Sequence, residues 1–378
     1  MIRPLAALLA LTLPFSAAMA ADAPQSAAAT AEAARAALVA AQDQLTKAEG
    51  ARDRVAALTA TVKAYEQGLI ALRDGLRRAT IRQQAIEAQL AAQSDEVAQL
   101  LAVLETMGKT PEPVMLLHPS GALGTARSGM LLADVTPALQ DKVATLRARL
   151  QEVADLRKVQ DGAADTLRRG LADAQKARAE LSAAISDRTD LPRRFAEDEV
   201  QTALLLASTD TLAAFASGLD GTLDGPETGT APDATPAKGA LPLPVAGQVL
   251  RGFNAADAAG IVRPGWVIAT APRALVTTPV AATVRFRGPL LDYGNVVILE
   301  PAPGVLFVLA GLGEVYGEAG QVLPAGSPVG LMGGATPDVD AILTETAAGA
   351  GQARTETLYL EVREGQGPVD PATWFAPD

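Results

Sequence analysis

Cysteine and histidine, the side chains that most often bind zinc or take part in nucleophilic catalysis, are almost absent from this sequence. The chain of 378 residues has no cysteine, which excludes disulfides, thiolate metal ligands and cysteine catalysis. Its single histidine, His118, lies in a proline-rich stretch that predicts a turn, where a lone histidine is typical of the surface. The region after residue 240 contains neither residue type, so we expect no zinc enzyme there.

Composition and charge narrow the class of protein. The formal net charge is −11. Proteins that bind nucleic acid normally present a basic face, so we expect no nucleic-acid partner. Hydrophobic residues make up 49% of the chain but aromatic residues only 3%. An apolar content made largely of alanine and leucine suits long helices with narrow cores.

The first twenty residues predict a signal peptide. Arg3 supplies a positive start, the stretch from Leu5 to Phe15 is apolar, and small residues precede a cleavage site after Ala20. The apolar run is shorter than the roughly 20 residues that span a bilayer, which makes a membrane anchor the less favoured alternative. We therefore expect an exported, periplasmic protein.

Residues 21–190 predict a long antiparallel coiled coil with a turn near 108–129. From residue 26 to 108 the chain avoids proline, and apolar residues recur at alternating spacings of three and four from Val55 to Met107. Leu38 and Leu45 lie off this seam, which predicts a phase shift near the N-terminal end. A second helix is expected from Met130 to Arg188, folding back on the first. A single helix of a globular bundle is the alternative.

The next two segments differ from the helices before them. Residues 191–218 predict a short apolar helical arm, which needs a cover from the hairpin, the C-terminal domain or a partner. Its candidate contact residues are Leu204, Leu205, Leu212 and Phe215. Residues 219–240 are rich in glycine, proline, aspartate and threonine, which predicts a flexible linker.

Residues 241–378 predict a small antiparallel β domain. Short β-prone runs are bounded by glycine and proline, namely Val276–Val280, Ala282–Arg287, Asn295–Glu300, Val305–Ala310 and Leu358–Arg363. Residues 334–355 are expected to form a loop. The whole chain is therefore expected to be a multidomain protein of helical and β parts.

Five segments of the C-terminal domain together resemble a known family: Arg263–Ala269, Tyr293–Ile298, Leu323–Gly330, Leu358–Arg363 and Val369–Trp374. Their motifs are similar to those of the LytM-type zinc metallopeptidases, which cut peptide cross-links in bacterial cell walls. An active member of that family holds zinc with histidine, aspartate and histidine and leaves a fourth position for water. The resemblance implies that this domain is degenerate, because those positions and the further catalytic histidine hold other residues, namely Arg263, Val267, Tyr359 and Thr357.

The order of the segments is also similar to that of the EnvC-type murein hydrolase activators. The resemblance implies a non-catalytic domain that binds and activates N-acetylmuramyl-L-alanine amidases during cell division. It also implies a coiled coil that docks on the FtsEX complex, and an arm that blocks the amidase-binding groove until FtsEX signals. No metal or cofactor is expected.

We expect seven residues of the five segments to line the partner-binding groove: Arg263, Trp266, Val267, Tyr293, Thr357, Tyr359 and Glu361. Core packing is the alternative for Trp266 and Tyr293, and an ion pair with Arg363 is the alternative for Glu361. The 334–355 loop should lie beside this groove. Two other functions stay open at this point: a structural adaptor whose domain only binds peptidoglycan, and an enzyme with a displaced metal site.

Overall fold

The computed structural model describes residues 27–92, 122–188, 191–224, 230–336, 338–347 and 355–376, apart from Gln366 and together with the single residues 98, 102 and 228. The predicted signal peptide, His118 and most of the predicted 108–129 turn lie outside these residues. Within the described part, no helix combines the length and the apolar character that crossing a membrane requires.

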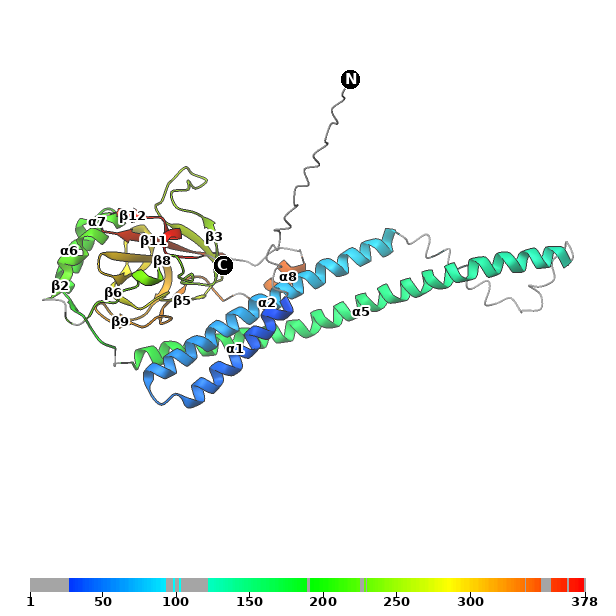
Figure 1. The fold of residues 1–378 in the computed structure, drawn as a ribbon, viewed down its shortest axis with the longest axis horizontal. Coiled ribbons are helices and arrows are strands. Elements are labelled where there is room, and N and C mark those ends of the chain that lie inside the picture. The colour runs from blue at the N-terminus through cyan, green and yellow to red at the C-terminus, as the bar shows by residue number, and fades with distance from the viewer. Residues whose placement is uncertain are drawn as a thin grey trace, which may run out of the picture.

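Three helices form a rod that extends from a β domain (Figure 1). They are α1 (Ala27–Lys47), α2 (Ala51–Ala92) and α5 (Ala122–Ser186). Cross-helix ion pairs show that α2 and α5 run antiparallel, since Glu66 meets Arg178 at 2.7 Å, whereas Glu87, farther along α2, meets the earlier α5 residue Arg157 at 2.8 Å. Apolar side chains of the predicted seam, such as Leu58 and Leu181, are buried between them.

Two helix boundaries differ from the sequence prediction. The predicted phase shift is a break: the chain leaves the helix after Lys47, and α1 folds back along α2 (Figure 1). Gly50 lies at this break, where its high conformational freedom disfavours a continuous helix. At the other end of the hairpin, α5 begins at Ala122, inside the predicted turn, and continues through Pro137.

The β domain is built on an antiparallel sheet, as predicted. Its ten strands are β3 (Gly247–Arg251), β4 (Trp266–Thr270), β5 (Leu275–Thr277), β6 (Ala282–Pro289), β7 (Asn295–Ala302), β8 (Val305–Val315), β9 (Val322–Leu323), β10 (Pro328–Met332), β11 (Glu356–Glu364) and β12 (Gly367–Val369). The main path is β3-β4-β11-β8-β7-β6-β9, with β10 joining β5 to β8 and β12 pairing with β11. Short 3-10 turns lie at Thr235–Ala237, Leu291–Tyr293 and Pro371–Thr373. The five segments that carry the resemblance all fall within this domain.

The central strands separate two apolar clusters, because side chains alternate between the faces of a strand. On β11, Leu358, Leu360 and Val362 enter the larger cluster together with Phe307 of β8. Tyr359 lies in the second cluster, on the opposite face, with Ile298 of β7. The second face is the one that carries the predicted site.

The arm covers this second face, but as two helices rather than one (Figure 1). They are α6 (Glu199–Ser208) and α7 (Leu212–Gly218), followed by a 3-10 turn at Leu219–Thr222. Thr211 ends the predicted continuous helix, because its side chain accepts a hydrogen bond from the N–H of Ala214 as the N-cap of α7. Strands β1 (Ala196–Glu197) and β2 (Leu223–Asp224) pair and close the base of the arm.

Two segments predicted as irregular are in part structured. Within the 219–240 linker, Leu219 lies in the cluster beneath the arm and Ala234 lies in the larger core, so these parts are packed rather than flexible. The predicted 334–355 loop contains α8 (Val339–Ala347), whose Ile342 is buried against Leu69 and Leu171 of the rod. This helix therefore packs against the rod, and its Val339 and Ile342 are not part of the cluster around Tyr359.

Candidate functional site

A buried chain of polar side chains occupies the second face of β11. The Tyr359 hydroxyl donates a hydrogen bond to Oε2 of Glu361 at 2.6 Å, and Nη1 of Arg363 donates to Oε1 of the same carboxylate at 2.8 Å. Glu361 and Arg363 are each only 2% exposed. Their charges therefore compensate each other inside the protein, as burial of an ion pair requires.

Tyr359 is held in place from three sides. Val267 is its register partner on β4, so these two predicted site residues lie side by side. The rings of Tyr359 and Tyr293 lie 5.7 Å apart between centroids. Gly265 leaves the space that the phenol ring occupies, since a Cβ there would come within 2.6 Å of the ring carbon Cε2. Residues 265, 267, 293 and 359 thus form one compact group.

Arg263 and Thr357 lie at the rim of this group rather than inside it. Both side chains are exposed. The guanidinium carbon of Arg263 lies 5.9 Å from the centroid of the Tyr293 ring, a geometry that allows a cation–π attraction. Thr357 precedes Tyr359 by two positions on β11 and therefore shares its face.

Trp266 does not belong to the predicted site. It is adjacent to Val267 on β4, so the alternation of the strand turns it to the opposite face, where it is buried in the larger core near Phe375. The alternative of core packing was correct for this residue. For Glu361, the alternative of an ion pair with Arg363 is present, although the carboxylate lies on the predicted face.

The arm and the predicted site share one buried cluster. Leu212 and Phe215 of α7 lie in it together with Tyr359, and the ring of Phe215 meets Phe286 of β6 edge-on at 4.7 Å. Leu205 is half-buried and packs against the same cluster. Leu204 is different from the other predicted arm residues, since it is 61% exposed on the outer side of α6.

The electrostatics of the group make it a poor acid or base near neutral pH. Burial and the neighbouring carboxylate of Glu361 raise the pKa of the Tyr359 hydroxyl far above its usual range. Burial also raises the pKa of Tyr293, although less. Among the described residues, no group of three or more histidine, cysteine, aspartate or glutamate side chains could hold a metal ion. The hydroxyls of Tyr293 and Tyr359 therefore stay protonated at neutral pH.

Two contributors to the site were missing from the sequence prediction, and a third, Arg363, was named only as an alternative ion-pair partner of Glu361. Arg363 is on the same face as Tyr359 and Glu361, as the two-residue period of the strand could have indicated. Phe286 follows Val284 in an alternating run, which predicts the same face for both, but a bulge between them turns Phe286 to the face of Tyr359. The role of Gly265 depends on the approach of a ring from another strand, which has no signal in the sequence.

Comparison with known proteins gives distant likenesses. No protein-family model matches the chain. The uncharacterized protein NMB1333 of Neisseria meningitidis serogroup B is 28% identical over 147 residues, which are 39% of this chain but 22% of that protein. Among solved structures, Csd3 of Helicobacter pylori is 19% identical with a TM-score of 0.28, over 36% of this chain and 34% of that one.

Two further structures are peptidases. A zinc-containing peptidase from Vibrio cholerae is 20% identical with a TM-score of 0.28, over 41% of this chain and 43% of that chain. The catalytic domain of the antimicrobial peptidase lysostaphin from Staphylococcus simulans is 14% identical with a TM-score of 0.26, over 33% of this chain and 89% of that one. These identities and TM-scores are too low to assign the chain to a family.

Proposed function

We propose that this protein is a non-catalytic activator of peptidoglycan amidases, built on a degenerate LytM-type domain and similar in layout to the EnvC-type activators. Its amidase-binding surface is the second face of the sheet, around Tyr359, Tyr293 and Val267. The arm covers this surface in the form described above. Activation requires the arm to leave it.

One observation carries the proposal: the arm packs in the same apolar cluster as Tyr359 and Val267, two of the four positions at which an active peptidase would carry catalytic residues. The arm was predicted from apolar residues between 191 and 218, and the site from motifs between 263 and 361. The two predictions are independent in sequence, yet Phe215 and Tyr359 share one core. An apolar helix placed on the site where a peptidase would bind its substrate is the arrangement expected of an internal inhibitor.

The chemistry of the site favours a binding role over hydrolysis. An arginine stays protonated and cannot ligate zinc, and valine has no lone pair to offer. The buried hydroxyl of Tyr359 is already bonded to Glu361, whose other oxygen accepts from Arg363. No histidine follows His118 in the chain. A zinc-bound water would therefore lack both its usual ligands and a general base.

The remaining parts of the proposal rest on the sequence resemblance. We assign the protein to the periplasm through its predicted signal peptide, and the helical hairpin to docking on the FtsEX complex. The arm acts as a tethered competitor at high effective concentration. If the face is open in about 1% of molecules, the apparent affinity for an amidase falls about a hundredfold, and release of the arm restores it.

The test compares full-length proteins in an amidase assay on dye-labelled sacculi. Phe215→Asp places a charge in a fully buried position and should open the arm, so dye release by an N-acetylmuramyl-L-alanine amidase should rise at least tenfold over the wild type. Leu204→Asp is the matched control, because this side chain is exposed on the same arm and should leave the rate unchanged.

The other outcomes separate the competing functions. If Phe215→Asp stays folded by circular dichroism but does not raise dye release, the activator proposal is wrong. Sedimentation of that variant with sacculi in the absence of amidase would then support the peptidoglycan-binding adaptor. Dye release without any amidase, together with stoichiometric zinc in the protein, would instead support an enzyme.

A further inference from the structure

The base of the rod is packed against the β domain on the side away from the arm-covered face. Leu58 of α2 and Leu181 of α5 lie in one buried cluster with Leu275 of β5 and Leu331 of β10. On the rim of this contact, Nζ of Lys63 donates a hydrogen bond to Oγ1 of Thr277 at 3.0 Å. The rod is thus docked on the domain.

Glu66 is the polar centre of this contact. Its carboxylate accepts a hydrogen bond from Nη2 of Arg178 at 2.7 Å and from the backbone N–H of Leu275 at 2.9 Å. The side chains of Arg178 and Glu66 are only 11% and 10% exposed. One carboxylate therefore joins both rod helices and the β domain. Removing it would leave the Arg178 charge buried without this partner, which strongly disfavours the docked arrangement.

A single loop contacts both the docked rod and the start of the arm. This junction loop, residues 316–321, follows β8. At one end, the Tyr316 hydroxyl is hydrogen-bonded to Oγ of Ser182 on α5 at 2.8 Å. At the other end, the Gly320 carbonyl accepts a hydrogen bond from the N–H of Arg194 at 2.8 Å. Between them, Glu318 pairs with Arg193.

The start of the arm, residues 191–195, is anchored by further bonds. The N–H of Val322 donates to the carbonyl of Pro192 at 2.8 Å. The Arg194 side chain is 5% exposed and donates to Glu300 at 2.8 Å and to Thr283 at 3.0 Å. This anchor is continuous with the junction loop, so displacement of the loop must strain or break it.

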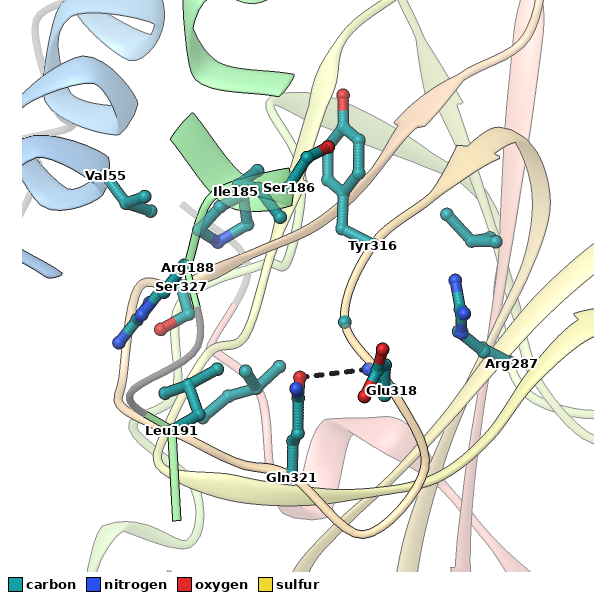
Figure 2. A pocket seen from close by; sticks show the side chains of 14 residues that line it. Val55, Ile185, Ser186, Arg188, Leu191, Arg287, Tyr316, Glu318, Gln321 and Ser327 are labelled. Carbon is teal, nitrogen blue, oxygen red and sulfur yellow. Dashed lines mark hydrogen bonds between the residues drawn. The ribbon is translucent and has the colours of Figure 1, made fainter. Parts of the chain in front are cut away.

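A cavity lies where the rod, the junction loop and the start of the arm meet. Its volume is about 230 Å³, and Ile185, Leu191, Tyr316 and Gln321 line it. Figure 2 shows Ile185 and Tyr316 above the space and Leu191 and Gln321 below it, with the Gln321 side chain accepting a hydrogen bond from the backbone N–H of Glu318. The space gives the loop room to shift without first displacing packed side chains.

We propose that the junction loop couples docking of the rod to anchoring of the arm, and that Glu66 is the latch that keeps the rod docked. A pull or twist along the rod breaks the latch, moves Tyr316 with α5 and loosens residues 191–195. The consequence for an amidase rests on the proposed function, but the coupling itself does not.

The test measures hydrogen exchange in the full-length chain after Glu66→Ala. The reporters are the backbone amides of Arg194 and Val322, whose bonds form the anchor. Both should exchange at least tenfold faster in the variant. A pair of spin labels on I81C and L250C, two exposed positions in a chain without cysteine, should report a longer or broader distance between rod and domain.

Glu87→Ala is the matched control, since Glu87 forms an exposed ion pair with Arg157 farther along α2. Glu87→Ala should change neither the exchange of the two amides nor the spin-label distance. A changed spin-label distance with unchanged amides would overturn the coupling, and an unchanged distance would overturn the latch. Tyr316→Phe, which removes only the hydroxyl bonded to Ser182, should raise exchange of the two amides by a smaller factor. If Tyr316→Phe does not raise the exchange of these amides, the junction loop is not the link between rod and arm.

A crosslink keeps the inference testable if Glu66→Ala does not fold. A short bismaleimide between K63C and T277C locks the rod on the domain, and exchange of both amides should then slow several-fold. Unchanged exchange would contradict the coupling. Loosened amides with no gain in amidase activity for Phe215→Asp would reject the proposed function alone. Unchanged amides together with a gain in amidase activity for Phe215→Asp would reject only the coupling.

Discussion

Tyr359, Glu361 and Arg363 define the chemistry of the arm-covered face at the scale of single residues. A peptidase would need an open metal position here, whereas this chain fills the space with a hydroxyl, a carboxylate and a guanidinium that bond to one another. Such a chain of polar groups is stabilising only when every member has its partner. These hydrogen bonds fix the positions of the three side chains on the face.

The buried pair gives a stability prediction. Glu361→Ala leaves Arg363 buried without its carboxylate partner and should lower the free energy of unfolding by about 3–5 kcal/mol in urea titrations. Glu314→Ala removes a half-exposed pair with Arg273 in the same domain and should cost no more than about 1 kcal/mol. An equal loss of unfolding free energy in the two variants would mean that the hydrogen-bonded side chains of Tyr359, Glu361 and Arg363 contribute little to stability.

The tyrosines predict how stability depends on alkaline pH. All four tyrosines of the chain have a pKa raised above the ordinary value, and burial raises the pKa of Tyr316 to about 12. The folded state therefore keeps protons that the unfolded state releases near pH 10, so stability should fall as pH rises from about 10 to 12. Tyr316→Phe should reduce this slope in urea midpoints measured across that range. An identical slope would show that Tyr316 ionises as it does in the unfolded chain.

At the scale of elements, the arm is a flap fixed at its base. Strands β1 and β2 pair at its two ends, and the anchor at residues 191–195 holds the first of them. The helices between these ends are short, and their stability depends on Leu212 and Phe215 rather than on helix propensity. The arm is therefore held both by its packing on the face and by its anchored base.

A substitution at Gly320 can test whether the base of the arm is fixed to the β domain. It has a φ of +83°, and a Cβ there would overlap the carbonyl of Phe195. Gly320→Ala should therefore destabilise the protein and expose the arm to limited proteolysis. Gly304→Ala is the matched control, with a φ of +74° and open space around it, so it should show only the backbone cost of roughly 1–2 kcal/mol. Proteolysis of the arm at equal rates in both variants would contradict the anchor.

At the scale of the whole molecule, the rod and the β domain share two apolar clusters. The first joins α2 and α5 to β5 and β10, and the second places α8 against both helices. The base of the rod is therefore part of the domain's fold. Folding of this base and of the domain should be cooperative, because neither side buries its apolar surface alone.

The two tryptophans make this cooperativity measurable. Trp266 and Trp374 are both in the β domain, whereas the signal of circular dichroism at helical wavelengths comes mainly from the rod. Leu181→Ala, in the shared cluster, should lower the unfolding midpoint seen by both probes, with a cost of about 2–5 kcal/mol. Ile81→Ala, at an exposed position on the rod, should move neither midpoint. A shift of the helical signal alone would show that the two parts unfold separately.

The sequence alone determined the kinds of element and much of the site. Heptad spacing located α2 and α5, and β-prone runs between glycine and proline located the principal strands, since both patterns are local. The absence of cysteine and the presence of a single histidine restricted the chemistry that the side chains could perform. The motif resemblance identified Tyr359, Tyr293 and Val267, which the fold brings together.

Only the tertiary structure decided which faces meet. Trp266 and Val267 are neighbours in sequence but enter opposite layers. On α6, Leu205 packs against the cluster beneath the arm, whereas its neighbour Leu204 is exposed. The docking of Glu66 on Leu275 joins residues more than two hundred positions apart. Local patterns specify helices and strands, but contacts between distant surfaces depend on the burial of both partners at once, which no single segment encodes.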